Sequence, residues 1–163
     1  MPKLKQLHAG HASAVLAFEL ANRAYFAASV ADRGDAFFDT FTDRYSALLA
    51  EQEAGVCAFY VLVAEDGSVL GRFNLYDIGN GTAELGYRVA QSVAGHGVAT
   101  AAVRELCRLA VARHGLRTLR AGTSRENLAS QRVLAKAGFV PADPAGPGDA
   151  SGPWFQCDLR GQQ

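Results

Sequence analysis

The sequence Ala83-Glu84-Leu85-Gly86-Tyr87-Arg88-Val89-Ala90 opens the stretch that decides the fold, which extends to Ala110. After a short connection the stretch continues as Ala94-Gly95-His96-Gly97-Val98-Ala99-Thr100, followed by an apolar run with helical spacing. This pattern predicts a strand, a glycine-rich turn and the start of a helix. The first N–H groups of a helix are unpaired and lie at its positive end, so the turn suits a phosphate group.

The two glycines of the turn leave two interpretations open. Gly95 and Gly97 lack a Cβ, so a ligand could approach the backbone closely, or the glycines could serve only the geometry of the turn. The turn is not a Walker motif, because no Gly-Lys-Ser/Thr follows it. It is not a G-x-G-x-x-G fingerprint either, because Thr100 stands at the third glycine.

The sequence around this stretch predicts one α+β domain over residues 1–163. Three strands with short turns form an antiparallel meander, and helices flank it. The predicted elements, in chain order, are a strand at 3–8, helices at 11–28 and 36–54, strands at 56–64, 69–77 and 82–90, a helix at 97–114, a strand at 116–123, a helix at 127–137 and a last strand at 154–159. The predicted order is β-α-α-β-β-β-α-β-α-β-β, in which two strands follow the last helix and only the one at 154–159 is given bounds. This order gives a mixed, mostly antiparallel central sheet with about four helices. Residues 141–153, with four prolines, predict a loop.

The composition favours a soluble protein without a polyanionic partner. Lys plus Arg equal Asp plus Glu at 16 each, so we expect neither nucleic acid nor a membrane as partner. The N-terminus lacks the apolar segment of a secretory signal, and Cys57, Cys107 and Cys157 predict buried, reduced thiols. We therefore expect a cytoplasmic protein. The four histidines have no metal-ligand spacing, which argues against a metal site.

A second group of polar residues follows the predicted strand at 116–123. Asn127 and Ser130 are one helical turn apart and share a face. Asn127 could be a helix cap, and Ser130 could be an exposed residue without a role.

Together the two segments resemble the Gcn5-related N-acetyltransferase (GNAT) superfamily, over nearly the whole chain. The superfamily's acetyl-CoA motif, Gln/Arg-x-x-Gly-x-Gly/Ala, falls on Ala94 to Ala99, where Gly97 and Ala99 match. Ala94 departs from the Gln or Arg of the motif, and His96 stands where a basic residue is common. His96 could contact phosphate, or be a surface histidine.

The downstream half is similar as well. Asn127, Ser130 and Gly138-Phe139 match the family spacing, and the serine is typical of the RimJ/RimL-like branch, the ribosomal-protein alanine acetyltransferases. Many family members have a tyrosine seven residues after the asparagine, which protonates the leaving thiolate. This chain has Leu134 at that position. The resemblance therefore implies a single GNAT-like domain that lacks the usual acid.

The resemblance implies transfer of an acetyl group from acetyl-CoA to a primary amine, by direct attack in a ternary complex. The branch favours a protein N-terminal α-amino group as acceptor. A small-molecule amine, such as an antibiotic or a polyamine, is the alternative within this class. A non-catalytic acyl-CoA-binding module and an unrelated nucleotide-binding protein are the alternatives outside it. The protein is expected to be a monomer or a homodimer.

Glu84 is the predicted general base, acting through a water molecule. Strand alternation places it on one face with Gly86 and Arg88, and its pKa would have to be raised by burial. An exposed carboxylate paired with Arg88 is the competing interpretation. Ser130, or Asn127 through water, would assist the leaving thiolate, although the serine could equally only bind CoA.

The resemblance also implies which residues bind the cofactor. The backbone around Val89 would pair with the pantetheine arm, which requires the strand to separate from its neighbour. The predicted CoA-binding residues are Tyr87, Arg88, Val89, Ala94, Gly95, His96, Gly97, Val98, Ala99, Thr100, Asn127 and Ser130. On the acceptor side we expect the first two helices and the loops at 29–35 and 141–153 to shape the site, with Tyr25, Phe26, Arg33, Asn74 and Tyr76 as candidate lining residues.

Overall fold

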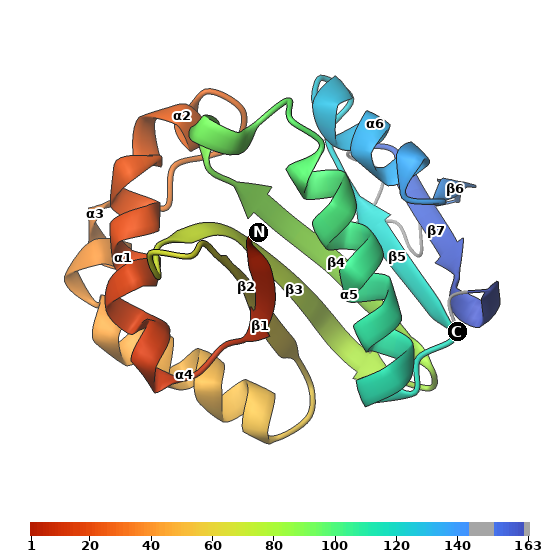
Figure 1. Cartoon of the computed structure of the whole chain (residues 1–163), viewed down its shortest axis with the longest axis horizontal. Coiled ribbons are helices and arrows are strands. Elements are labelled where there is room, and N and C mark those ends of the chain that lie inside the picture. The colour runs from red at the N-terminus through yellow and green to blue at the C-terminus, as the bar shows by residue number, and fades with distance from the viewer. Residues whose placement is uncertain (144–151, 162–163) are drawn as a thin grey trace.

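The computed structural model of the protein describes residues 1–143 and 152–161. These residues form a seven-stranded sheet in the order β1-β2-β3-β4-β5-β7-β6 (Figure 1). Its neighbouring strands pair antiparallel, except β4 and β5, which are parallel. The strands are β1 (Lys3–Gln6), β2 (Ala58–Val63), β3 (Val69–Gly79), β4 (Thr82–Val89), β5 (Thr118–Gly122), β6 (Val140–Ala142) and β7 (Trp154–Asp158).

Helices cover both faces of the sheet and create two cores. The side chains of β2 alternate, so that Phe59 and Val61 pack in one core with α1 and α4, and Tyr60 and Leu62 pack in the other with α5. Figure 1 shows α1 to α4 gathered beside β1 and β2, and α5 and α6 beside β4 and β5. The helices are α1 (Ala12–Ala21), α2 (Arg23–Ala27), α3 (Asp35–Asp39), α4 (Phe41–Glu53), α5 (Val98–His114) and α6 (Leu128–Lys136).

The predicted fold class is confirmed, but each of the first two predicted helices is broken once. Asn22 separates α1 from α2, and its side-chain amide donates to the Phe18 carbonyl. Thr40 separates α3 from α4, and its hydroxyl donates to the Ala36 carbonyl. Short polar side chains that bind the backbone four residues earlier compete with regular helix, which explains both breaks.

The start of the predicted proline-rich loop is also different. Pro141 and Ala142 belong to β6, which pairs with β7. A proline is tolerated there because β6 is an edge strand. The rest of that loop lies largely outside the described residues. Cys107 and Cys157 are buried as predicted, whereas Cys57 is only half-buried.

The feature that positions the site is the short contact between β4 and β5. Their register covers Thr82 with Thr118, Ala83 with Leu119 and Glu84 with Arg120. β4 then continues to Val89 and β5 to Gly122 without further pairing to each other in the described residues. The two strands therefore separate after Glu84, as the family resemblance implies. Among the described helices, none is both long enough and apolar enough to cross a bilayer.

Candidate active site

The glycine turn has the geometry of an anion-binding helix start. Gly95 and Gly97 have φ of 80° and 76°, a region that side chains with a Cβ rarely adopt, and a Cβ at either position would meet no atom within 4 Å. Gly97 is the N-cap of α5, and no described side chain bonds to this helix end. Its first N–H groups are therefore left to water or a ligand.

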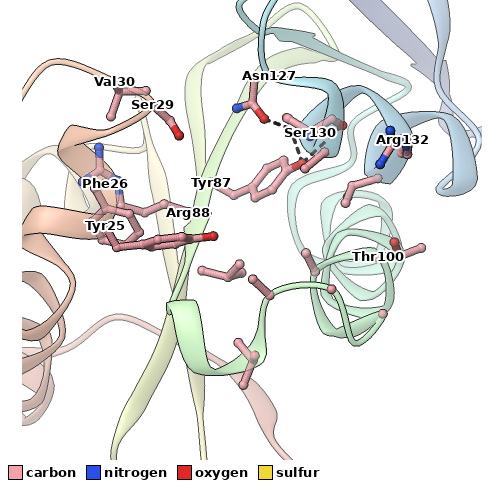
Figure 2. Close-up of a pocket in the computed structure, with 18 of the residues that line it drawn as sticks. Tyr25, Phe26, Ser29, Val30, Tyr87, Arg88, Thr100, Asn127, Ser130 and Arg132 are labelled. Atoms are coloured by element: carbon pink, nitrogen blue, oxygen red, sulfur yellow. Dashed lines mark hydrogen bonds between the residues drawn. The ribbon is translucent and has the colours of Figure 1, made fainter.

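A cavity of about 420 Å³ extends from this turn across the end of β4 (Figure 2). Figure 2 shows one wall formed by α2 and the residues after it, and the opposite wall formed by α6. The strand between them supplies Tyr87, which points toward α6, and Arg88, which points toward α2. The lining residues are Tyr25, Phe26, Ser29, Val30, Tyr87, Arg88, Val89, Val93, Ala94, Gly95, Gly97, Ala99, Thr100, Asn127, Ala129, Ser130, Arg132, Val133 and Lys136.

Most of the predicted CoA-binding residues thus meet in one cavity. Of that set, only His96 and Val98 do not line it. Glu84, the predicted base, does not line it either, and lies half-buried where β4 and β5 separate. Of the candidate acceptor residues, Tyr25 and Phe26 line the cavity, whereas Arg33, Asn74 and Tyr76 do not.

Hydrogen bonds connect β4 to α6 across the cavity. The Asn127 side chain caps α6 by accepting from the Ser130 N–H at 3.1 Å, so the cap interpretation of Asn127 is confirmed. The Ser130 hydroxyl lies 3.0 Å from the Tyr87 hydroxyl. Both hydroxyls therefore lie at the cavity wall. Position 134, where many family members have a tyrosine, is a leucine in this chain. Leu134 itself is buried in the core.

Tyr87 is held rigidly as a neutral phenol. Its ring stacks on Phe73 with centroids 5.5 Å apart and planes 8° apart. Burial raises the pKa of the Tyr87 phenol above its ordinary value, and the hydrogen bond with Ser130 offsets only part of this. The phenol therefore remains protonated at neutral pH.

On the opposite face of β4, Arg88 belongs to a cluster of charged side chains. Glu19 of α1 is buried and accepts from Arg33 at 2.9 Å, from Arg72 at 2.9 Å and from Arg88 at 3.4 Å. The Arg88 guanidinium also lies 4.4 Å from the centre of the Phe26 ring. One carboxylate thus orients three guanidiniums behind the α2 wall of the cavity.

The charges of this cluster shift the pKa values of its members. Burial works to raise the pKa of the Glu19 carboxyl, but Arg33 and Arg72 outweigh it and hold that pKa below the ordinary value. The pKa of the Arg88 guanidinium is lowered by burial and then by the charge of Arg33. Glu19 is therefore ionised, and Arg88 lies in a field with an excess of positive charge.

The same face of the sheet carries further polar groups in register. Arg72 lies opposite Arg88, Asn74 opposite Gly86, and Tyr76 opposite Glu84. The Asn74 side chain donates to the Tyr76 hydroxyl, while its own carbonyl oxygen has no hydrogen-bond partner in the described part of the chain. Gly86, between Arg88 and Glu84, lies under the Tyr76 ring, which a Cβ at this position would approach to 3.0 Å.

Sequence reasoning missed two parts of the site. Arg132 and Lys136 line the cavity from α6, and their spacing of four residues was a usable signal, since it places both on one helix face. The Glu19 cluster joins residues up to 69 positions apart, and its only signal was a glutamate within an apolar helical stretch. Within residues 1–143 and 152–161, no three His, Cys, Asp or Glu side chains form a group that could hold a metal ion.

The donors around the cavity fit a CoA pyrophosphate. The open helix start at Gly97 offers backbone N–H groups, and Arg132 and Lys136 add two cations on the neighbouring wall. The separated part of β4 offers backbone groups to the extended arm of such a ligand.

The sequence matches the acetyltransferase (GNAT) domain family over residues 3–140. The chain therefore belongs to that family, and the predicted family resemblance is confirmed. A curated relative, a probable N-acetyltransferase YjcK of Bacillus subtilis, is 37% identical over 84 residues, which are 50% of this chain and 46% of the relative. The match thus spans about half the length of that relative.

Solved structures of several acetyltransferases share the fold. The ribosomal-protein-S5-alanine acetyltransferase of Vibrio fischeri has a TM-score of 0.84 at 18% identity, with 99% of this chain and 95% of that chain covered. RimJ of Mycobacterium smegmatis, in complex with CoA-disulfide, has a TM-score of 0.78 at 24% identity, with 94% of this chain and 78% of that chain covered. The spermidine N-acetyltransferase of Vibrio cholerae, with CoA and spermine, has 0.79 at 14%, with 99% and 97% covered. At these identities the likeness extends to the fold alone.

Proposed function

We propose that the protein transfers an acetyl group from acetyl-CoA to a primary amine, by direct attack of the amine on the thioester in a ternary complex. The observation that carries this proposal is the cavity that joins the uncapped start of α5 to the separated end of β4 and the α2 wall. It has room for a cofactor arm at one end and an acceptor at the other. Membership of the acetyltransferase family supports the same conclusion.

The backbone near Val89 holds the thioester in this proposal. Val89 ends β4 beyond its last pairing with β5, so its backbone groups on that side are available to a ligand. A backbone N–H aimed at the thioester oxygen stabilises the negative charge that develops there during attack. The pyrophosphate binds at Gly95 to Thr100, with Arg132 and Lys136 beside it.

Glu84 serves as general base through a water molecule. The attacking amine must lose a proton to have a free lone pair, and it loses its second proton as the amide forms. Glu84 is half-buried on the face that also carries Arg88. Because Glu84 stands outside the cavity wall, the proton reaches it through water.

The leaving thiolate takes its proton from the hydroxyl pair of Tyr87 and Ser130. A serine alone is a weak acid, whereas a phenol, even with its pKa raised by burial as in Tyr87, is closer to a thiol. The 3.0 Å contact allows the serine to pass the phenol proton on. This pair takes the role of the tyrosine that many family members have at the position of Leu134.

The acceptor we favour is a protein N-terminal α-amino group. Support comes from Ser130, which resembles the RimJ/RimL-like branch, and the structures with the same fold include a ribosomal-protein alanine acetyltransferase. A polyamine is the second candidate, because a spermidine acetyltransferase also shares the fold.

The test is an assay of free thiol released from acetyl-CoA, with peptides of varied N-termini and a panel of small amines. In Glu84→Gln we expect kcat to fall by about one to several powers of ten while CoA binding, measured by calorimetry, persists. Glu65→Gln, an exposed acid in the β2–β3 turn, is the matched control and should retain activity. A protein that binds acetyl-CoA and acetylates no amine in the panel would instead be a non-catalytic acyl-CoA-binding module.

A further inference from the structure

The acceptor end of the cavity is lined by a cation and by no carboxylate. The charged residues among the described lining are Arg88, Arg132 and Lys136. Arg132 and Lys136 belong to α6, beside the start of α5. Arg88 points the other way, toward Phe26 and the α2 wall (Figure 2). It is therefore the charged side chain that an acceptor would meet.

Arg88 is only partly neutralised by its own partner. The Glu19 carboxylate binds Arg33 and Arg72 at 2.9 Å each, and lies 3.4 Å from Arg88. Three guanidiniums thus share one carboxylate. The Arg88 side chain is also 24% exposed, against 7% for Arg72, so part of it remains accessible from the cavity. The pKa of Arg88 is lowered first by burial and then by the charge of Arg33.

Two other acids lie nearby, and they are directed elsewhere. Asp32 and Asp35 bind Arg23 at 2.8 Å and 2.9 Å. Neither lines the cavity. Arg23 offsets one of these two negative charges, and neither carboxylate forms an ion pair with Arg88 in the described residues.

We propose that the acceptor carries a carboxylate close to its primary amino group and that Arg88 binds this carboxylate. The inference rests on the proposed acetyl transfer. Alternate residues on one strand face are about 7 Å apart, so Arg88 lies on one side of Gly86 and Glu84 on the other. The Tyr76 ring lies over Gly86 between them, so an acceptor whose carboxylate binds Arg88 at the cavity wall would pass its amine proton to Glu84 through water. A polyamine would bring ammonium groups toward Arg88 and be repelled.

Two kinds of acceptor carry a carboxylate close to a primary amino group. One is a peptide with Asp or Glu as its second residue, and the other is a free amino acid with its own carboxylate. Matched pairs separate them: a C-terminally amidated peptide beginning Ala-Glu against one beginning Ala-Gln, and an α-amino acid against its amide. Spermidine serves as the polycation.

The experiment measures kcat/KM for each acceptor by thiol release, in the wild type and in three variants. We expect kcat/KM for the carboxylate member of at least one pair to exceed that of its amide partner by about tenfold or more, because a carboxylate can form charge-assisted hydrogen bonds with Arg88. Arg88→Gln should abolish this preference, and Arg88→Lys should retain part of it because the charge remains. Arg132→Gln, at the cofactor end, should weaken acetyl-CoA binding and leave the preference intact. Thermal unfolding checks that Arg88→Gln is folded, which we expect because Glu19 keeps two arginine partners.

The outcomes separate this inference from the function on which it rests. Equal kcat/KM within every pair, preference for spermidine, or an undiminished preference in folded Arg88→Gln would overturn the inference while acetyl transfer stands. If no amine releases thiol although CoA binds, the proposed transfer fails and the inference fails with it.

Discussion

The hydroxyl oxygens of Tyr87 and Ser130 lie 3.0 Å apart and link β4 to α6 across the cavity. This contact lies beyond Glu84, in the part of β4 that no longer pairs with β5. It therefore connects β4 to α6 at the opening between the two strands. The Asn127 side chain fixes the backbone of Ser130, and Phe73 stacks on the ring of Tyr87. Both hydroxyls are therefore presented to the cavity in one defined arrangement.

If this pair protonates the leaving thiolate, Tyr87→Phe and Ser130→Ala should each lower kcat by about tenfold or more, with little change in KM for acetyl-CoA. In the double variant kcat should fall no further than in the worse single variant, because the two groups act as one relay. Because burial raises the pKa of Tyr87, wild-type kcat should not decline on the alkaline side below about pH 10. An unchanged kcat in Tyr87→Phe would show that the phenol takes no part.

The glycine turn predicts a difference between the two ends of α5. Gly97 at its start and Gly115 at its end both have positive φ, 76° and 61°, with open space beyond the Cα. Alanine at either position should destabilise the fold by about 1–2 kcal/mol, since left-handed backbone is costly for residues with a Cβ. Only Gly97→Ala should also weaken CoA binding, because only that end of the helix faces the cavity. Calorimetry with CoA and urea unfolding provide the two measurements, and equal CoA affinities would contradict the turn as the pyrophosphate site.

Glu19 should contribute to stability in a pH-dependent way. Its pKa is lowered in the folded protein, so its contribution is complete above its unfolded pKa of about 4.3 and is lost as the pH falls through the folded value. Glu19→Gln should cost about 3–5 kcal/mol at pH 7, because three guanidiniums lose their buried partner. The difference in unfolding free energy between wild type and variant should become smaller below about pH 4. Urea unfolding across this range tests it, with exposed Glu65→Gln as the control that changes little.

Gly86 provides a test of where the acceptor lies. A Cβ there would come within 3.0 Å of the Tyr76 ring, so the ring would have to shift on the strand face that carries Arg88 and Glu84. Gly86→Ala should therefore raise KM for the acceptor by about tenfold, the effect of one methyl group in a fitted site, and leave CoA affinity unchanged. Gly79→Ala, in the same sheet but with open space around it, should alter neither value. An unaffected acceptor KM in Gly86→Ala would place the acceptor elsewhere.

Local patterns in the sequence were sufficient for most of the fold. The β2–β3–β4 meander followed from alternation and turn residues, and the bounds of α5 followed from Gly97 and Gly115. Asn127 was recognisable as a cap because capping depends on residues one turn apart. These features involve only neighbours in the chain, which is why a single sequence was enough to predict them.

What sequence reasoning missed depends on residues far apart or on competing hydrogen bonds. The breaks at Asn22 and Thr40 arise from side chains that bind their own helix, in stretches whose apolar spacing favours continuous helices. The contact of Tyr87 with Ser130 spans 43 positions, and that of Glu19 with Arg72 spans 53. No periodicity signals such pairs, since the fold alone brings them together.

The separation of β4 from β5 leaves a strand edge inside the sheet. Exposed edges are open to pairing with other chains, but here α5 and α6 lie beside the opening (Figure 1), so only a slender extended molecule can reach it. Such a molecule would act as an eighth, temporary strand. Its binding would then be coupled to folding, and the melting temperature of the protein should rise with the logarithm of the ligand concentration once that concentration exceeds Kd.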